Sequence, residues 1–311
     1  MKVAALDLGS NTFLCLIAEV QGQQITKIYA DQTEVVRLGQ GLSQSKKFHP
    51  EALARADRCL SRFAQLIQVH NPEKVLAMAT SAARDAENRE DLFEICKKHQ
   101  IPIEIIDGEK EAAITYEGAT SAIVANQKKI MVIDIGGGST EFIFGIDRQL
   151  LRGESYNIGS VRLTEKFISN QPTPLSEVQL AVDFIEEHIE RAFAIKPKDF
   201  SLDEIIAVAG TPTALVVAIL GQFDPARVDG FQLSLTDLEN WSRRLIPASV
   251  QQKIDMGIPQ GRADVILIGV LILIQTLKKF NQKTLSVSTR GVRYGVALEM
   301  DRRRYLGSQQ P

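Results

Sequence analysis

The chain has 311 residues, of which 44% are hydrophobic and 24% are charged. At about 150 residues per domain, this length predicts two domains with sizeable cores. Thirty-six Lys and Arg side chains against 38 Asp and Glu give a net charge of −2. Such a balance creates no overall field that would attract nucleic acid or a membrane surface, so an anionic ligand would need a local cationic groove.

The cysteines are Cys15, Cys59 and Cys96, an odd number without a CxxC pair. This pattern argues against a disulfide framework or a zinc cluster and fits a reducing compartment. The first ten residues reach Asp7 before any long apolar stretch, so they do not read as a signal peptide. The most apolar run, 265–274, is about half the length that a membrane span needs. We therefore expect a soluble, cytoplasmic protein that binds neither nucleic acid nor membranes.

Two passages share one pattern, in which an apolar run ends at an Asp, passes through a Gly/Ser/Thr turn and enters a second apolar run. The first extends from Val3 to Ile17 and contains Asp7; the second extends from Met131 to Phe144 and contains Asp134. The pattern is typical of a β-hairpin. The two Asp residues lie 134 − 7 = 127 positions apart, close to a domain length. This spacing indicates an internal duplication into two similar domains.

Helices and strands alternate after each hairpin. The apolar spacing predicts helices over 51–69, 85–99, 108–122, 176–193, 213–220, 235–245, 263–280 and a closing helix to about residue 305, with strands over 74–80, 101–106, 204–209 and 285–288. A hairpin followed by such alternation predicts mixed α/β domains. We place the boundary at the polar stretch 126–129, which gives domains 1–125 and 126–311, with the last helix, about 294–311, free to pack back on the first.

Both turns have the composition of phosphate-binding loops. Glycines allow backbone N–H groups to converge on an anion, and an Asp at the preceding strand end can hold Mg²⁺ beside the phosphate oxygens. Further donors are available from Ser10, Asn11, Thr12 and Ser139. An ordinary tight hairpin explains one copy equally well, but two copies at a domain-length spacing favour phosphate binding.

A third small-residue turn, at Gly210 and Thr211, leads from an apolar strand into a helix. Helix N-termini favour anions, so this turn is another candidate phosphate contact. Thr211 would serve equally well as an ordinary helix cap.

The hairpins and AVAGTPTAL (207–215) are similar to the phosphate and adenosine motifs of the actin/Hsp70/sugar-kinase superfamily. More narrowly, the chain resembles the exopolyphosphatase/guanosine pentaphosphatase family. The blocks that carry this resemblance are DLGSNTFLCLIAEV (7–20), VVRLGQGL (35–42), ATSAARDAENR (79–89), DGEKEAAITYEGA (107–119), VIDIGGGSTEFIFG (132–145), YNIGSVRLTEKF (156–167), AVAGTPTAL and GIPQGRADVILIGVLIL (257–273). The resemblance implies two duplicated RNase H-like (actin-like ATPase) domains that flank an active-site cleft. It is closest to the short, two-domain form, which lacks the C-terminal helical module of longer members.

The resemblance also implies roles for particular residues. Glu111 is the implied catalytic base, which orients or deprotonates water, although an acid at a helix start has an ordinary electrostatic explanation too. Lys110 departs from the family, which usually has an acid there. The implied metal ligands are Asp134 and, in support, Asp7, for Mg²⁺ or Mn²⁺. The implied phosphate contacts are Gly136, Gly137, Gly138 and Ser139, with Ser10, Asn11 and Thr12 opposite, and Arg84, Gly210 and Thr211.

Three Arg residues follow predicted strand ends. Arg84 follows a strand end, where a guanidinium can bind phosphate oxygens, or it forms a surface salt bridge with Asp85 or Glu87. Arg290 and Arg293 follow a strand and have at most a supporting role.

The expected activity is release of terminal orthophosphate from inorganic polyphosphate, preferably short chains, by Mg²⁺-assisted attack of water. Guanosine pentaphosphate (pppGpp) is the alternative substrate. More distant alternatives are a phosphotransferase of the same superfamily and a non-catalytic, nucleotide-dependent assembly protein. We also expect a homodimer.

Overall fold

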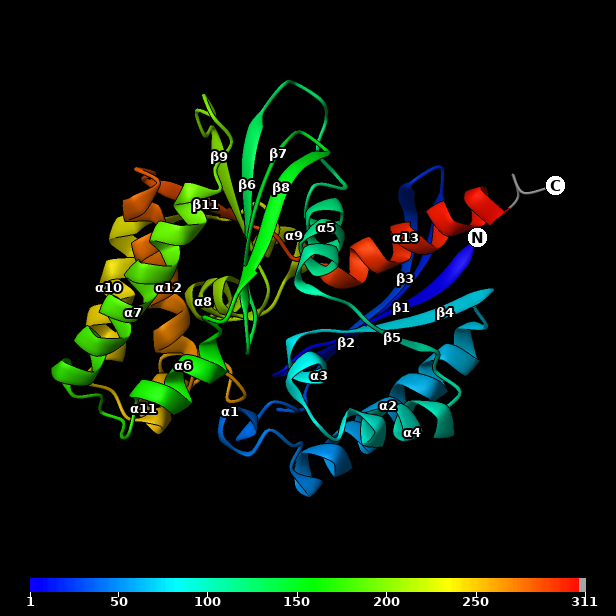
Figure 1. Cartoon of the computed structure of the whole chain (residues 1–311), viewed down its shortest axis with the longest axis horizontal. Helices are drawn as coiled ribbons and strands as arrows, with labels where there is room; N and C mark the ends of the chain where they lie inside the picture. Colours follow the sequence, from blue (N-terminus) through cyan, green and yellow to red (C-terminus); the bar gives the residue numbers. More distant parts are fainter. Residues whose placement is uncertain (308–311) are drawn as a thin grey trace. The chain divides into compact units, whose positions relative to one another are not determined.

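The computed structural model describes residues 1–307, which form two compact units (Figure 1). The first unit contains residues 1–122 and 291–307, and the second is the continuous segment Ile123–Arg290. The chain therefore leaves the first unit once and returns to it for helix α13 (Val292–Gly307). Positions 308–311 of the expected closing helix lie outside the described residues.

The first unit is built on a five-stranded sheet. Its strands are β1 (Lys2–Leu8), β2 (Thr12–Gln21), β3 (Gln24–Val35), β4 (Lys74–Ala79) and β5 (Ile103–Ile105), in the spatial order β3-β2-β1-β4-β5. β1 pairs antiparallel with β2 and parallel with β4. The predicted hairpin therefore lies inside a mixed sheet, with β1 as its central strand.

Both faces of this sheet are covered, because alternate residues of β1 are apolar on opposite sides. Leu6 and Leu8 belong to the core with α2 (Pro50–His70) and α4 (Arg89–Lys98). Ala5 belongs to a second core with α5 (Gly108–Ala119) and α13. Two short helices, α1 (Leu42–Ser45) and α3 (Ser81–Asp85), complete the unit.

The second unit is built on a six-stranded sheet. Its strands are β6 (Lys129–Ile135), β7 (Thr140–Ile146), β8 (Gln149–Tyr156), β9 (Glu204–Val208), β10 (Gln232–Ser234) and β11 (Thr284–Val287), in the order β10-β11-β9-β6-β7-β8. The helices are α6 (Ser160–Phe167), α7 (Leu175–Ala194), α8 (Gly210–Leu220), α9 (Pro225–Val228), α10 (Leu235–Leu245), α11 (Val250–Asp255) and α12 (Ile266–Lys279). The apolar α12 lies in the core of this unit, packed against α7 and α10.

The two sheets repeat one connectivity. In each, three consecutive strands form an antiparallel meander whose first strand also pairs in parallel with the fourth: β1 with β4, and β6 with β9. The α/β class and the duplication predicted from the two Asp-Gly passages are thus confirmed. No helix within residues 1–307 combines the length and the apolar character that crossing a membrane requires.

The sequence pattern missed the third strand of each meander. β3 and β8 are mostly exposed or half-buried, so they lack the apolar alternation that marks a strand. The helix expected over 85–99 begins later, as α4 at Arg89, because Asp85 ends the separate short helix α3 and Asn88 caps α4. The amide oxygen of Asn88 accepts a hydrogen bond from the N–H of Phe48 at 2.7 Å, which fixes this break against a distant part of the chain.

The polar stretch chosen as a boundary is bound to the second unit. The backbone N–H groups of Asn126, Gln127 and Lys128 all donate to the carboxylate of Asp147, at 3.2, 2.9 and 2.9 Å. Lys128 also accepts from the N–H of Asp147 at 2.8 Å. The contact boundary accordingly falls earlier, between Ala122 and Ile123.

Candidate active site

The turn between β1 and β2 is held in one conformation by its neighbours. The N–H of Gly9 donates to the carbonyl of Thr12 at 3.1 Å and closes the turn. The carbonyl of Ser10 accepts from Gly39 at 2.7 Å, and that of Asn11 accepts from the backbone N–H of Arg37 at 2.8 Å. The segment after β3 therefore binds the carbonyl side of this turn.

The turn between β6 and β7 repeats this arrangement in the second unit. The N–H of Gly136 donates to the carbonyl of Ser139 at 3.0 Å, at the position equivalent to the Gly9–Thr12 bond. The carbonyls of Gly136 and Gly137 accept from the first N–H groups of α6, at 2.9–3.0 Å. These are the donors that a helix N-terminus leaves without an intrahelical partner.

The approach of α6 to this turn needs a glycine at its cap. A Cβ on Gly159 would lie 2.3 Å from the carbonyl oxygen of Gly137. Among the described residues, nothing accepts a hydrogen bond from the buried amides of Gly137 and Gly138. Unpartnered amides in a glycine turn are the donors with which a backbone nest binds an anion.

A carboxylate that the sequence reasoning missed lies beside Asp134. Glu141 pairs directly with Asp134 across β6 and β7, so the two side chains share one face of the sheet. Glu141 is 1% exposed, and its carboxylate accepts from the hydroxyls of Ser139 and Ser155 at 2.8 and 2.6 Å. The sequence signal that could have identified Glu141 is an acidic residue within the otherwise apolar strand TEFIFGI. Ser139 thus donates its hydroxyl to Glu141, and its backbone closes the turn.

The first unit holds an unbalanced pair of acids. The Oδ1 atom of Asp7 is buried and has no hydrogen-bond partner. Burial, reinforced by the negative charge of Glu111, raises the pKa of Asp7 to about 7, against the opposing effect of Arg293. A buried carboxylate next to a second acid is unfavourable unless a cation compensates for it.

Glu111 lies in the first turn of α5 and is 5% exposed. Its Oε2 atom forms an ion pair with Nη1 of Arg84 at 2.5 Å, and the same nitrogen donates to the carbonyl of Ile106 at 3.0 Å. The structure therefore pairs Arg84 with Glu111, and not with the neighbouring acids proposed as its alternative partners. This contact joins two residues to which the sequence analysis assigned roles.

The two arginines near the last strand differ in their surroundings. Arg293, on α13, forms a two-bond ion pair with Asp31 of β3 at 2.7 and 2.8 Å, and the hydroxyl of Tyr294 donates to the same carboxylate at 3.0 Å. Its positive charge acts on Asp7, as stated above. Arg290, in the second unit, lies 3.7 Å from Asp229. Arg293 is thus linked electrostatically to a predicted site residue.

The turn at Gly210 is packed against an arginine that the sequence reasoning also missed. A Cβ on Gly210 would lie 1.9 Å from Cζ of Arg262, so the guanidinium covers the start of α8. Thr211 is 1% exposed and its hydroxyl packs against Gly269 of α12. A phosphate contact at this turn would therefore come from backbone N–H groups and from Arg262.

Ala209, just before α8, has a strained backbone with φ +71° and ψ −163°. This region is almost restricted to glycine and costs an alanine about 1–3 kcal/mol. We expect Ala209→Gly to raise the free energy of unfolding by about 1 kcal/mol, after the larger entropy of the unfolded glycine is subtracted. The same change at Ala214, inside α8, should lower it by about 1 kcal/mol. Urea unfolding of both variants gives the two signs, and destabilisation by Ala209→Gly would show that the strain is absent.

The acids of the first unit fit a divalent cation. Among residues 1–307, no three His, Cys, Asp or Glu side chains gather as a metal cluster. Mg²⁺ is commonly bound through one or two carboxylates together with substrate phosphates and water. The unpartnered Oδ1 of Asp7, beside the charge of Glu111, provides this kind of site.

A duplicated sheet whose first hairpins carry an acid and a glycine turn defines a two-domain protein with the actin-like fold. Solved structures agree with this class. The crystal structure of the Aquifex aeolicus member of the Ppx/GppA protein family is 27% identical and aligns with a TM-score of 0.80, over 98% of each chain.

Sequence comparison identifies the family. The model of the Ppx/GppA phosphatase family matches residues 16–304, so the chain belongs to this family and is a hydrolase. Exopolyphosphatase 2 of Mycobacterium tuberculosis is 32% identical over 96% of this chain and 98% of its own length. The guanosine-5'-triphosphate,3'-diphosphate pyrophosphatase of Pseudoalteromonas atlantica is 30% identical over 96% of this chain, which spans 58% of that longer protein.

Proposed function

We propose that this phosphatase is an exopolyphosphatase, which releases orthophosphate from the end of inorganic polyphosphate by attack of water. The observation that carries the proposal is Glu111, a buried carboxylate oriented by Arg84 next to the unpartnered Asp7. A hydrolase needs a base directed at water, whereas a kinase transfers phosphate to a bound acceptor.

The roles follow from the chemistry of each group. Glu111 accepts a proton from the attacking water, and Arg84 holds its carboxylate in place. The amides of Gly137 and Gly138 bind phosphate oxygens in the second unit, and Ser10, Asn11 and Thr12 form the corresponding turn in the first. Asp7 in the first unit and Asp134 in the second would each offer a carboxylate to Mg²⁺ or Mn²⁺. When bound, such an ion supplies positive charge that stabilises the charge developing on the phosphate oxygens.

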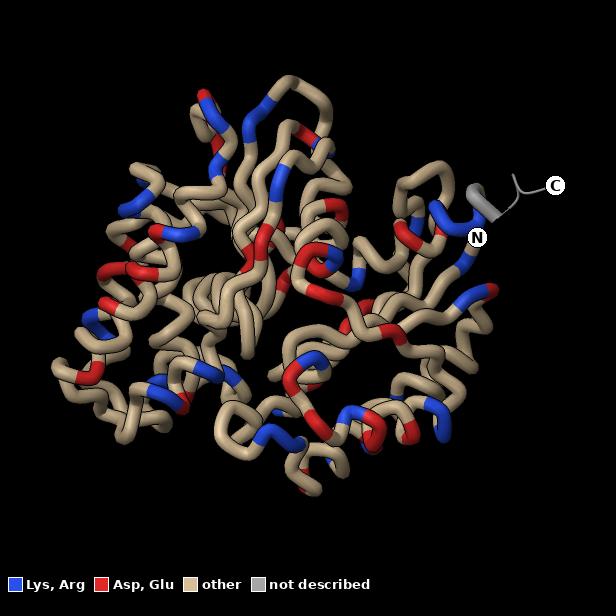
Figure 2. Tube along the Cα trace, viewed as in Figure 1, with Lys and Arg blue, Asp and Glu red and all other residues tan. Residues whose placement is uncertain are grey.

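Polyphosphate is favoured over pppGpp by what each substrate needs beyond its terminal phosphate. A guanine base requires a stacking surface, and the chain's one tryptophan, Trp241, is 6% exposed in the core. A phosphate chain requires local cationic side chains, and Figure 2 shows Lys and Arg distributed over both units. The relative named exopolyphosphatase also matches this chain over 98% of its own length.

We expect kcat/KM to be higher for polyphosphate than for pppGpp and higher for short than for long chains. Phosphate contacts are screened by salt, so the values for polyphosphate should fall steeply between low and high ionic strength. The measurement is phosphate release from short polyphosphate, long polyphosphate and pppGpp at two salt concentrations. A pppGpp value well above both polyphosphates, with little salt dependence, would contradict this choice of substrate.

The same assay separates the remaining classes. A hydrolase releases phosphate without an acceptor or ADP, whereas a phosphotransferase needs an acceptor and an assembly protein releases none. We further propose a cytoplasmic homodimer. The three cysteines are free and buried, as suits a reducing compartment, and light scattering of the purified protein measures its mass.

A further inference from the structure

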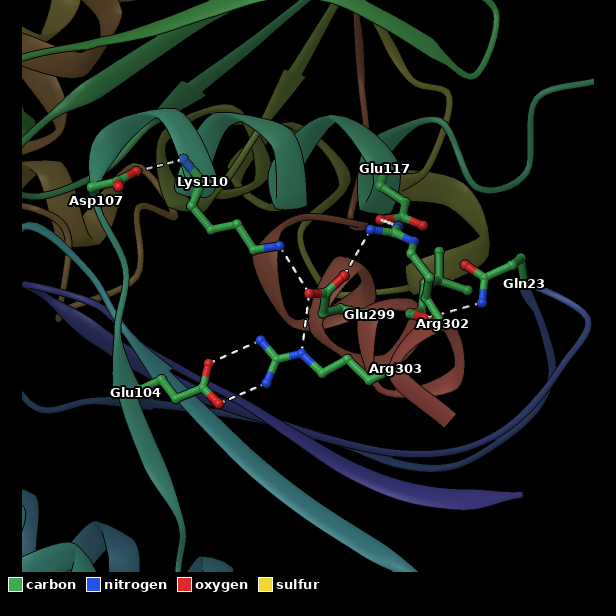
Figure 3. Close-up of polar contacts among 9 residues, drawn as sticks. Gln23, Glu104, Asp107, Lys110, Glu117, Glu299, Arg302 and Arg303 are labelled. Atoms are coloured by element: carbon green, nitrogen blue, oxygen red, sulfur yellow. Dashed lines mark hydrogen bonds and ion pairs between the residues drawn. The ribbon is translucent and has the colours of Figure 1, made fainter. Parts of the chain in front are cut away.

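A cluster of charges connects α5, the helix that carries Glu111, to α13 (Figure 3). At its centre is Glu299, which is 6% exposed. Its carboxylate accepts from Lys110 at 2.8 Å, from Arg302 at 2.7 Å and from Arg303 at 3.1 Å. Burial acts to raise the pKa of Glu299, but these hydrogen bonds outweigh it and hold the pKa below its usual range. The cluster is therefore a set of ionised, mutually compensated groups.

The members of the cluster differ in how far they depend on Glu299. Arg303 also binds Glu104 of β5 through two bonds, at 2.6 and 2.9 Å, and Arg302 also binds Glu117. Within the described residues, the ammonium group of Lys110 forms its ion pair with Glu299. Loss of the Glu299 charge would therefore leave each arginine with another acid but release Lys110.

α13 is itself anchored to the sheet. The side-chain amide of Gln23, in the β2–β3 turn, donates to the carbonyl of Leu298, and its backbone N–H donates to Asp301 at 2.9 Å. The Arg303–Glu104 pair fixes the same helix to β5. α13 thus provides a fixed frame against which α5 is placed.

α5 meets this frame through close backbone packing, through the Glu117–Arg302 pair and through the Lys110–Glu299 pair. In the backbone contact, a Cβ on Gly118 would lie 2.2 Å from the carbonyl oxygen of Gly291, and one on Gly295 would lie 1.9 Å from that of Ile114. The Lys110–Glu299 pair lies nearer the start of α5, four residues or about 6 Å before Ile114. It therefore adds a contact at the first turn of α5, where Glu111 lies.

Lys110 also lies next to the residue that matters most for the proposed reaction. Its backbone N–H donates to the N-cap side chain of Asp107 at 2.8 Å, and the N–H of Glu111 donates to the carbonyl of Asp107 at 2.9 Å. The ammonium and the backbone of Lys110 are therefore both held, one by α13 and the other by the helix cap. These contacts fix the first turn of α5, which carries Glu111.

We propose that Lys110 and Glu299 are positioning residues for Glu111: their ion pair fixes the first turn of α5 on α13 and so sets the place of the carboxylate. The inference rests on the proposed role of Glu111 as the base. A displacement of about 1 Å at a reacting group can cost about 10²-fold in rate, so a loosened first turn lowers turnover without loss of substrate affinity.

The test compares Lys110→Met, Glu299→Gln and the double variant in the full-length protein, with phosphate release from polyphosphate as the assay. We expect each to lower kcat about tenfold or more with KM within about twofold, and the double variant to be no worse than either single one, because one interaction is lost in all three. Lys110→Arg, which keeps the ion pair, should restore kcat.

Glu117→Gln is the matched control, because it breaks an ion pair between the same two helices at the far end of α5. It should change the melting temperature but leave kcat unaltered. Normal kcat in both Lys110→Met and Glu299→Gln, with an inactive Glu111→Gln, would overturn the positioning role and leave the proposed function intact. A raised KM in Lys110→Met alone would also overturn it, since Lys110 would then contact substrate directly. An active Glu111→Gln would instead refute the function on which the inference rests.

Discussion

Glu111→Gln is expected to lose about 10²–10⁴-fold in kcat, the usual contribution of a general base, with little change in KM. The amide has nearly the shape of the carboxylate but cannot accept a proton from water. Its oxygen can still accept the hydrogen bond of Arg84, so the ion pair becomes a weaker contact and the fold is retained. The measurement is phosphate release under saturating substrate, with circular dichroism to verify folding.

Glu109→Gln is the matched control for this change. Glu109 lies in the same first turn of α5 but is exposed. The Glu109→Gln substitution removes one negative charge at the same helix end as Glu111→Gln. A general electrostatic effect on the helix would therefore appear in both variants. Turnover of a well-folded Glu111→Gln protein at the level of Glu109→Gln would remove Glu111 from the mechanism.

Activity is expected to require a divalent cation, and Asp7→Asn should abolish most of it. Two observations motivate this: the buried Oδ1 without a partner and the neighbouring charge of Glu111. The wild-type protein should be inactive in excess EDTA and regain activity with Mg²⁺ or Mn²⁺. Asp134→Ala should weaken the rate and the metal dependence together. Full activity in excess EDTA would refute the metal role of both residues.

The same substitution should have the opposite effect on stability when no metal is present. Folding raises the pKa of Asp7, so the folded state is favoured when this carboxyl group is protonated. Its contribution to the free energy of unfolding is present below the ordinary pKa of 3.8 and is lost as the pH rises through about 7. At neutral pH the loss amounts to at most about 4 kcal/mol. Asp7→Asn should therefore melt several degrees above wild type in EDTA. Added Mg²⁺ should stabilise wild type but not the variant; a lower melting temperature for Asp7→Asn in EDTA would contradict this account.

Much of the fold could be predicted because its signals are local. An apolar run that ends in Asp and enters a glycine turn marks each first hairpin, and the repetition of this pattern revealed the duplicated units. Strands β3 and β8 escaped because their exposed residues leave no apolar alternation, so pairing with a buried neighbour decides their conformation. The polar stretch 126–129 likewise does not mark the boundary between the two units, because Asp147 binds its backbone to the second unit.

The candidate site divides in the same way. The sequence by itself determined which residue types are present: the glycine turns, Asp7, Asp134 and the acid at the start of α5, all within short motifs. The tertiary structure alone decided their burial and their pairing partners. It buried the Oδ1 atom of Asp7 without a hydrogen-bond partner, and it joined Arg84 to Glu111 across 27 positions and Lys110 to Glu299 across 189. Such contacts depend on how distant segments pack. Neither charge nor periodicity along the chain specifies which charged side chains will form ion pairs away from solvent.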